Sequence, residues 1–209
     1  MNISCLPLGD YQANCYVITD ENTKLASVID PGIPSDELND LLLGYELKYI
    51  LLTHGHFDHI FGCESLKTLY PDCKICIHKD DEICLKDKTR NLVGDFEGDL
   101  PELKADILLD DSDIIDLSDD ITFKVIHTPG HSKGSVCYYS PTYNVLFSGD
   151  TLFCRTVGRT DFIGGDFDTM MKSVKLLSLL PPETVVLPGH NRSTTIDDEK
   201  HKNRYMRKL

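Results

Sequence analysis

The segment THGHFDH (residues 53–59) decides how this chain is interpreted. It follows an apolar run over 49–53 that predicts a strand, and it combines three imidazoles with one carboxylate. His54 and His56 lie two residues apart on extended chain, so they are expected to point in about the same direction. Asp58 and His59 open a helix and project differently. Because divalent metals such as zinc prefer imidazole and carboxylate donors, the segment predicts ligands for two neighbouring ions.

Three further apolar runs end in a turn that is followed directly by a metal-binding side chain. HTPGH ends at His131, SGD at Asp150 and LPGH at His190. Glycine or Pro-Gly stops each strand and lets the next side chain face the sheet edge. The four strand ends together supply seven candidate ligands: His54, His56, Asp58, His59, His131, Asp150 and His190. Each alone could be a cap or a turn residue, but their coincidence favours metal. His78 also follows a strand but is expected to be a surface or packing residue, and His127 is expected to lie behind the ligands.

Strand-like and helix-like segments alternate along the chain without a low-complexity linker. Helices are expected over 35–43, with Ser35 as the N-cap, over 59–69, over 167–180 and from about 196. Segment 79–106 is interpreted as a loop or short-helix insert, and the acidic run 110–120 as a hairpin rather than a calcium loop. Apolar and β-branched runs predict strands over 16–19, 26–30, 49–53, 74–78, 121–128, 136–140, 145–148 and 184–187. We expect one domain over residues 1–209.

Four motifs resemble the successive signatures of the metallo-β-lactamase-fold superfamily: THGHFDH, HTPGH (127–131), SGDTLF (148–153) and LPGH (187–190). The match covers nearly the whole chain. GRTDF (158–162) and the tail TTI…EK…N resemble the short, single-domain branch of glyoxalase II-like (hydroxyacylglutathione hydrolase-like) enzymes. The resemblance implies an α+β fold, a four-layer αββα sandwich, with the metal site at one edge of the two sheets.

The resemblance also implies roles for individual residues. It assigns His54, His56 and His131 to the first metal and Asp58, His59 and His190 to the second, with Asp150 bridging. Asp30, in VIDPG, matches an acidic position that supports the metal loop from behind the ligands. Arg159 and Asp161 fall near the site, where they either orient substrate or form a salt bridge between loops.

The implied function is that of a binuclear metal-dependent hydrolase. It would cleave a thioester or related acyl or ester bond with a metal-bound hydroxide. Two divalent ions are the expected cofactors, because such ions lower the pKa of bound water and stabilise an oxyanion. Zinc is favoured over iron or manganese. Asp58 is the expected catalytic residue, since it could bind metal and also orient the hydroxide. No serine or cysteine nucleophile is required.

Two other interpretations stay open. Persulfide dioxygenases, which use one iron and oxygen, share this fold and carry a GRTDF-like segment; two histidines and one carboxylate are a subset of the ligands here. The second alternative is a non-catalytic protein that keeps its metals structurally. β-Lactamase activity is disfavoured because Asp150 stands where the common zinc lactamases use a cysteine.

Composition limits the partners. There are 21 Lys and Arg against 34 Asp and Glu, a net charge of −13, which argues against binding nucleic acid or anionic membranes. No apolar run approaches the ~18 residues of a membrane helix, and no signal peptide is apparent. The eight cysteines are therefore expected to be reduced thiols in the cytoplasm. The expected partner is a small-molecule substrate, and a homo-oligomer is left open.

Overall fold

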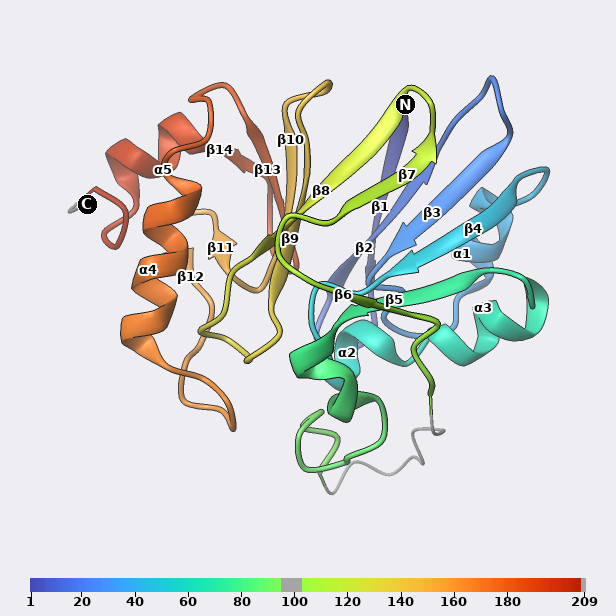
Figure 1. Ribbon diagram of the computed structural model, residues 1–209, viewed down its shortest axis with the longest axis horizontal. Coiled ribbons are helices and arrows are strands. Elements are labelled where there is room, and N and C mark those ends of the chain that lie inside the picture. Colours follow the sequence, from blue (N-terminus) through green and yellow to red (C-terminus); the bar gives the residue numbers. More distant parts are fainter. Residues whose placement is uncertain (95–102, 208–209) are drawn as a thin grey trace.

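Two six-stranded sheets face one another in the computed structural model, which describes residues 1–94 and 103–207 (Figure 1). The first sheet has the order β1-β2-β3-β4-β5-β6 and the second the order β14-β13-β10-β9-β8-β7, while β11 pairs with β12 alone. The strands are β1 Asn2–Leu8, β2 Ala13–Thr19, β3 Leu25–Ile29, β4 Glu46–Leu51, β5 Lys74–His78, β6 Ile107–Leu109, β7 Ile114–Ser118, β8 Ile121–His127, β9 Val136–Ser140, β10 Val145–Gly149, β11 Leu152–Phe153, β12 Thr156–Val157, β13 Val185–Pro188 and β14 Thr194–Thr195.

Helices cover the outer faces of both sheets (Figure 1). The helices of the first half, α1 to α3, lie against the first sheet, and α4 and α5 lie against the second. A short 3-10 helix, η1, follows β5. The helices are α1 Asp36–Leu41, α2 Phe57–Ile60, α3 Cys63–Leu69, η1 Lys79–Leu85, α4 Phe167–Leu177 and α5 Ile196–Lys202. Among the described residues, no helix is long and apolar enough to cross a membrane.

Three buried apolar clusters lie between the four layers and hold them together. One packs α1 and α3 on the first sheet, through residues such as Leu38 and Leu66. The second lies between the sheets and includes Phe123 and Phe147. The third packs α4 on the second sheet, for example through Val174. The predicted αββα sandwich is confirmed.

Burial on both faces explains why the central strands are mostly apolar. Every residue of β2 is buried. Along β3, Val28 points into the helix-side cluster, whereas Ile29 points between the sheets. Successive side chains on a strand face opposite sides, so a strand covered on both sides needs apolar residues at every position.

The sequence-based elements need several corrections, and the two-residue strands β11, β12 and β14 were not expected. The edge strand β1 was not expected; its mixed exposure and Pro7 hide the strand pattern, although an edge position tolerates proline. The three-residue β6 was also missed. The single helix expected over 59–69 is two helices, α2 and α3, because the helix is interrupted at Gly62. The Gly62 N–H donates to the Gly32 carbonyl at 2.6 Å. The hairpin expected over 110–120 is confirmed as β7 pairing with β8.

Candidate metal centre

The loops that follow four strands meet at one edge of the two sheets. The segment after β4 carries His54, His56, Asp58 and His59, while β8, β10 and β13 are followed by the three other candidates. β4 belongs to the first sheet and the other three strands to the second. All seven candidates lie in one constellation: His54, His56, Asp58, His59, His131, Asp150 and His190. The site therefore straddles both sheets, and neither sheet alone holds a complete donor set.

The first donor group consists of three imidazoles. One ring nitrogen each from His54, His56 and His131 lies within 4.8 Å of the others. The rings meet nearly edge to face, at 87° between His54 and His56 and 77° between His56 and His131. This arrangement lets the in-plane lone pairs of different rings converge on one point, as tetrahedral zinc sites require.

The second donor group combines carboxylate and imidazole. Asp58 Oδ2 lies 3.6 Å from His59 Nε2 and 3.4 Å from His190 Nε2. Asp150 reaches both groups: its Oδ1 is 3.6 Å from His59 Nε2, and its Oδ2 is 3.5 Å from His131 Nε2. The side chain predicted to bridge two metals thus lies between the two sets of donors.

Hydrogen bonds at the opposite ring nitrogens fix the direction in which these imidazoles point. His59 Nδ1 bonds to Asp30 Oδ2 at 3.0 Å, and the same carboxylate accepts from the Thr53 hydroxyl and N–H. His131 Nδ1 bonds to the Arg159 carbonyl at 2.8 Å and His190 Nδ1 to the Tyr11 carbonyl at 3.1 Å. With Nδ1 engaged, Nε2 is the atom left to bind an ion, the usual arrangement behind metal-bound histidine.

Unpaired buried atoms show that this site suits cations. The Nε2 atoms of four histidines and Oδ1 of Asp150 have no hydrogen-bond partner in the described part of the chain. The four histidines are His54, His56, His59 and His131. Burying unpaired polar atoms costs about 1–3 kcal/mol each. Divalent ions coordinated by these unpaired atoms would explain why so many of them converge on one site. Imidazole nitrogens and carboxylate oxygens are donors that fit such ions.

The two donor groups differ in their electrostatics. Burial and the neighbouring imidazoles lower the pKa of His54 and of His56, for His56 to about 2, so both are neutral and ready to bind metal. Burial acts in the same direction on His59, but the surrounding carboxylates, Asp58 first, outweigh it and raise its pKa to about 10. In the metal-free protein the second group therefore holds a proton that a metal ion would displace.

A cavity of about 750 Å³ opens onto the two donor groups. Phe57, Phe153 and Phe162 give it apolar walls, and Arg159 lies on its lining. The Arg159 guanidinium lies 4.2 Å from the Phe162 ring centre and pairs with Asp161 through contacts of 2.9 and 2.8 Å. Both side chains of this pair are 66% exposed. Arg159 thus lies beside the site, and its ion pair lies within one loop instead of joining two loops as the alternative expectation had it.

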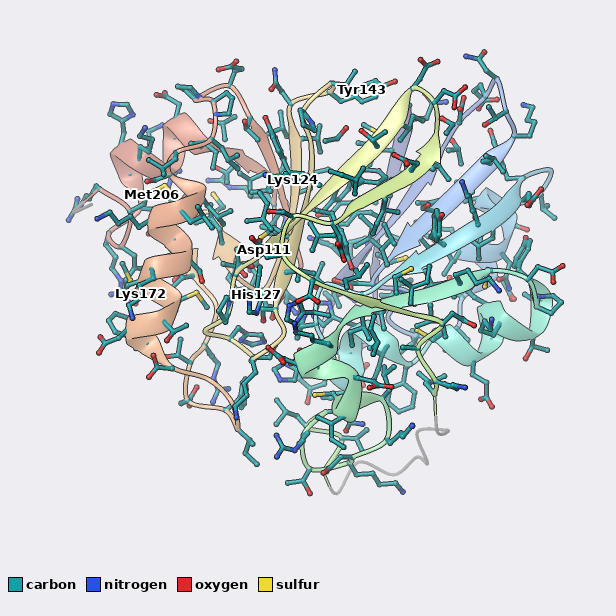
Figure 2. All side chains as sticks on the ribbon, in the orientation of Figure 1. Asp111, Lys124, His127, Tyr143, Lys172 and Met206 are labelled. Atoms are coloured by element: carbon teal, nitrogen blue, oxygen red, sulfur yellow. The ribbon has the colours of Figure 1, made fainter. Side chains whose placement is uncertain are left out.

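His78, Asp80 and His127 form a further group of close donors, away from the seven candidates. Its rings are stacked, with centres 4.0 Å apart and planes 13° from parallel, so their in-plane lone pairs run side by side and do not converge. His127 lies at the end of β8 beside Asp111, which accepts a hydrogen bond from the His127 backbone N–H at 2.9 Å (Figure 2). The stacked arrangement of the two rings opposes metal binding. Of the two roles expected for His78, surface or packing, the structure shows packing, because His78 is buried.

Sequence reasoning overlooked two residues behind the ligands. Thr53 links Asp30 to His54, with Oγ1 3.0 Å from His54 Nδ1, and its place at the strand end was the available signal. Asp81, in η1, contacts the loops on both sides of the first donor group. It lies within the segment taken as a loop insert and has no local pattern that could have identified it.

Comparison with known proteins agrees with this geometry. The sequence-family model of the metallo-β-lactamase superfamily matches residues 8–190, and the chain belongs to that superfamily. Over 206 residues it is 34% identical to a Bacillus subtilis protein named probable metallo-hydrolase YqgX, covering 96% of this chain and 95% of that one. It is 33% identical to the hydroxyacylglutathione hydrolase GloC of Haemophilus influenzae, covering 99% and 98% of the two chains.

Solved structures show the same likeness. BLEG-1, described as a B3 metallo-β-lactamase, has a TM-score of 0.91 and 35% identity, with 98% of this chain and 99% of that one covered. TTHA1623 in a di-iron-bound form has a TM-score of 0.83 and 33% identity, with 97% and 99% covered. ETHE1 from Myxococcus xanthus has a TM-score of 0.80 and 27% identity, with 98% and 84% covered. The two sequence relatives are hydrolases by name, and the solved structures share the fold of this chain.

Proposed function

We propose that this chain is a binuclear metal-dependent hydrolase that cleaves a thioester or related acyl or ester bond. It would act within one domain over residues 1–209, in the manner of hydroxyacylglutathione hydrolases. The observation that carries the proposal is the position of Asp150, with Oδ1 3.6 Å from His59 and Oδ2 3.5 Å from His131. One carboxylate shared by two complete donor groups is suited to two ions and exceeds what one ion needs.

The first ion would be held by His54, His56 and His131 and the second by Asp58, His59 and His190, with Asp150 shared. Divalent ions bound there would act as Lewis acids and lower the pKa of bound water. Zinc is our first choice for both ions; the di-iron form of TTHA1623 supports iron as an alternative, and manganese is a further one.

The chain itself would orient the reactants and exclude solvent. The Asp58 side chain is 17% exposed, lines the cavity, and is the group we assign to orient the attacking water. The aromatic walls of the cavity would cover an acyl group and limit competing water. A thiolate leaving group is a weak base, so a thioester substrate needs no strong general acid from the chain.

The substrate proposal has two supports. A cavity of about 750 Å³ is within the usual range for small-molecule sites. The hydroxyacylglutathione hydrolase GloC aligns over 98% of its own length.

All eight cysteines are free thiols, which is typical of proteins kept in a reducing compartment, and we propose the cytoplasm as the location.

The likeness to ETHE1 favours one second candidate, a mononuclear-iron persulfide dioxygenase. Such an enzyme would use two histidines and one carboxylate, a subset of the donors here. It would leave part of the second donor group without a function, and this is why we rank it second.

Elemental analysis of the purified protein, combined with a substrate panel, tests the proposal. The panel contains a hydroxyacylglutathione, a simple acyl thioester, glutathione persulfide with an oxygen electrode and, because of BLEG-1, a β-lactam. We expect about two metal ions per chain and thioester hydrolysis. One iron per chain with oxygen consumption would instead identify the dioxygenase. A fully metal-loaded protein that turns over no substrate would favour a non-catalytic metal-binding protein.

A further inference from the structure

Asp81 is a buried carboxylate that belongs to neither donor group. It lies in η1 and is 2% exposed. Its Oδ2 accepts from the Ser132 hydroxyl at 2.6 Å and from the Gly55 N–H at 3.2 Å, and its Oδ1 accepts from the Gly134 N–H at 2.7 Å. A carboxylate removed from water is costly unless it is well satisfied by hydrogen bonds, so this position is unlike that of an ordinary surface aspartate.

The partners of Asp81 all belong to the loops that carry the first donor group. Gly55 lies between His54 and His56 in the segment after β4. Ser132 directly follows His131 in the loop after β8, and Gly134 is two residues further on. One carboxylate therefore ties together, across the two sheets, the loops that supply all three imidazoles of the first group.

The close approach of η1 to these loops depends on glycine. A Cβ at Gly134 would lie 2.5 Å from the Asp81 nitrogen and 2.7 Å from its Cβ. A Cβ at Gly55 would lie 2.3 Å from the Cβ of Cys84, also in η1. Backbone N–H groups can thus reach the carboxylate only because both loops present bare backbone to η1.

Asp30 provides the comparison, because it is the other buried carboxylate behind the site. It bonds directly to His59 Nδ1, in the second donor group, and through Thr53 it also reaches His54, in the first. Within the described residues, Asp81 has no hydrogen bond to an imidazole and instead holds two backbone N–H groups and the Ser132 hydroxyl. The two carboxylates thus support the site by different means, Asp30 through a ligand ring and Asp81 through the loops.

We propose that Asp81 is a positioning residue that holds the loops of His54, His56 and His131 in the geometry needed to bind the first metal ion. This inference rests on the metal binding of the proposed function and extends it to a residue outside the ligand set. Groups behind metal ligands typically change affinity 10–100-fold when they are removed. The expected effect is selective, because Asp81 bonds the loop after β4 at Gly55, between His54 and His56, and bonds the loop after β8 directly behind His131.

The test uses Co²⁺ as the probe and follows its visible absorption during titration of metal-free protein, with a competing chelator to obtain two dissociation constants. His56→Asn and His190→Asn assign the bands of the first and second sites. We expect Asp81→Ala to weaken the first site about 10–100-fold and to change its Co²⁺ spectrum, with the second site within about threefold. Asp81→Asn keeps one acceptor oxygen and should restore part of the affinity.

Asp80→Asn is the matched control, since the Asp80 side chain is 48% exposed in the same helix; both sites should bind as in the parent protein. Thermal unfolding in EDTA separates positioning from a general loss of stability. If Asp81→Ala fails to fold, Asp81→Asn and Ser132→Ala carry the test. The inference is wrong if both sites weaken equally in step with stability, or if neither weakens. A protein that binds two Co²⁺ ions but hydrolyses nothing would remove the proposed function and leave the role of Asp81 intact.

Discussion

Asp30 Oδ2 lies 3.0 Å from His59 Nδ1, and both side chains are almost completely buried. Because that carboxylate also accepts from the N–H and hydroxyl of Thr53, it is held rigidly by the strand that precedes the metal loop. The bond directs His59 Nε2 toward Asp58 and Asp150, each 3.6 Å away. The orientation of a metal-binding ring is thus set by a residue 29 positions earlier in the chain.

Replacing Asp30 with Ala should weaken metal binding at the second donor group about 10–100-fold, because His59 loses the acceptor that fixes its ring. Chelator competition with Zn²⁺ measures the change. Asp36→Asn, at an exposed position in α1, serves as the control and should bind metal normally. Unchanged affinity in Asp30→Ala would show that packing alone orients His59.

Asp150→Ala should reduce hydrolysis at least about 100-fold and lower the metal content, since the carboxylate lies between the two donor groups. Steady-state kinetics on a thioester and elemental analysis measure the two effects. Asp168→Asn, exposed in the first turn of α4, is the control. Full activity with both ions retained in Asp150→Ala would contradict a bridging role.

The metal-free protein should be most stable near pH 6.5–7. The pKa of His56 is about 2 in the folded protein and about 6.5 in the unfolded chain, so stability falls as the pH drops below about 6.5. His59 has the opposite shift, to about 10, and its contribution is complete below about 6.5 and declines as the pH rises toward 10.

Thermal unfolding in EDTA between pH 5 and 9 measures both limbs. The range stops at 9 because buried cysteines with raised pKa, such as Cys63, also favour unfolding above it. His56→Asn should make the acidic limb less steep, with the remainder due to His54, whose pKa is also lowered, and should leave the alkaline limb in place. Stability that rises steadily from pH 7 to 9 would be inconsistent with a protonated His59.

Gly189→Ala should disrupt the site by crowding. The added Cβ would lie 2.2 Å from Asp150 Oδ1 and 3.0 Å from His59 Cε1, so we expect metal affinity to fall by more than about tenfold. Gly44→Ala is an informative control, because its φ of +82° strains an alanine while nothing lies within 4 Å. It should cost about 1–2 kcal/mol of unfolding free energy and leave metal binding unchanged. Equal metal binding in both variants would contradict the steric argument.

Glu199→Ala should lower stability by about 3 kcal/mol. Glu199 is fully buried in α5 and accepts from Arg155, Thr194 and Asn203. These bonds hold the turn between β11 and β12 against the tail and explain the glutamate and asparagine of the tail motif. Lys202→Ala, an exposed i,i+4 partner of Asp198, should cost less than about 0.5 kcal/mol. Denaturant unfolding compares the two; similar losses would refute the role of Glu199.

Local patterns carried much of the fold. Strands such as β2 are covered on both faces, so most of their residues are apolar and readily recognised. β1 escaped because an edge strand with one paired side has no such demand. The break in the helix after His59 also escaped, because Gly62 meets Gly32 and Pro31 only after the chain has folded.

The donor chemistry could be predicted from the sequence: which imidazoles and carboxylates follow strand ends, and that they suit divalent metals. That information is local, because a turn and the residue after it lie within a few positions. Asp30 behind the ligands was expected from the family resemblance, whereas the supporting roles of Thr53 and Asp81 became visible only in the folded chain. Asp81 bonds to residues 26, 51 and 53 positions away, and such pairing leaves no periodicity in the chain. It exists because two sheets pack face to face and bring distant loops to one edge.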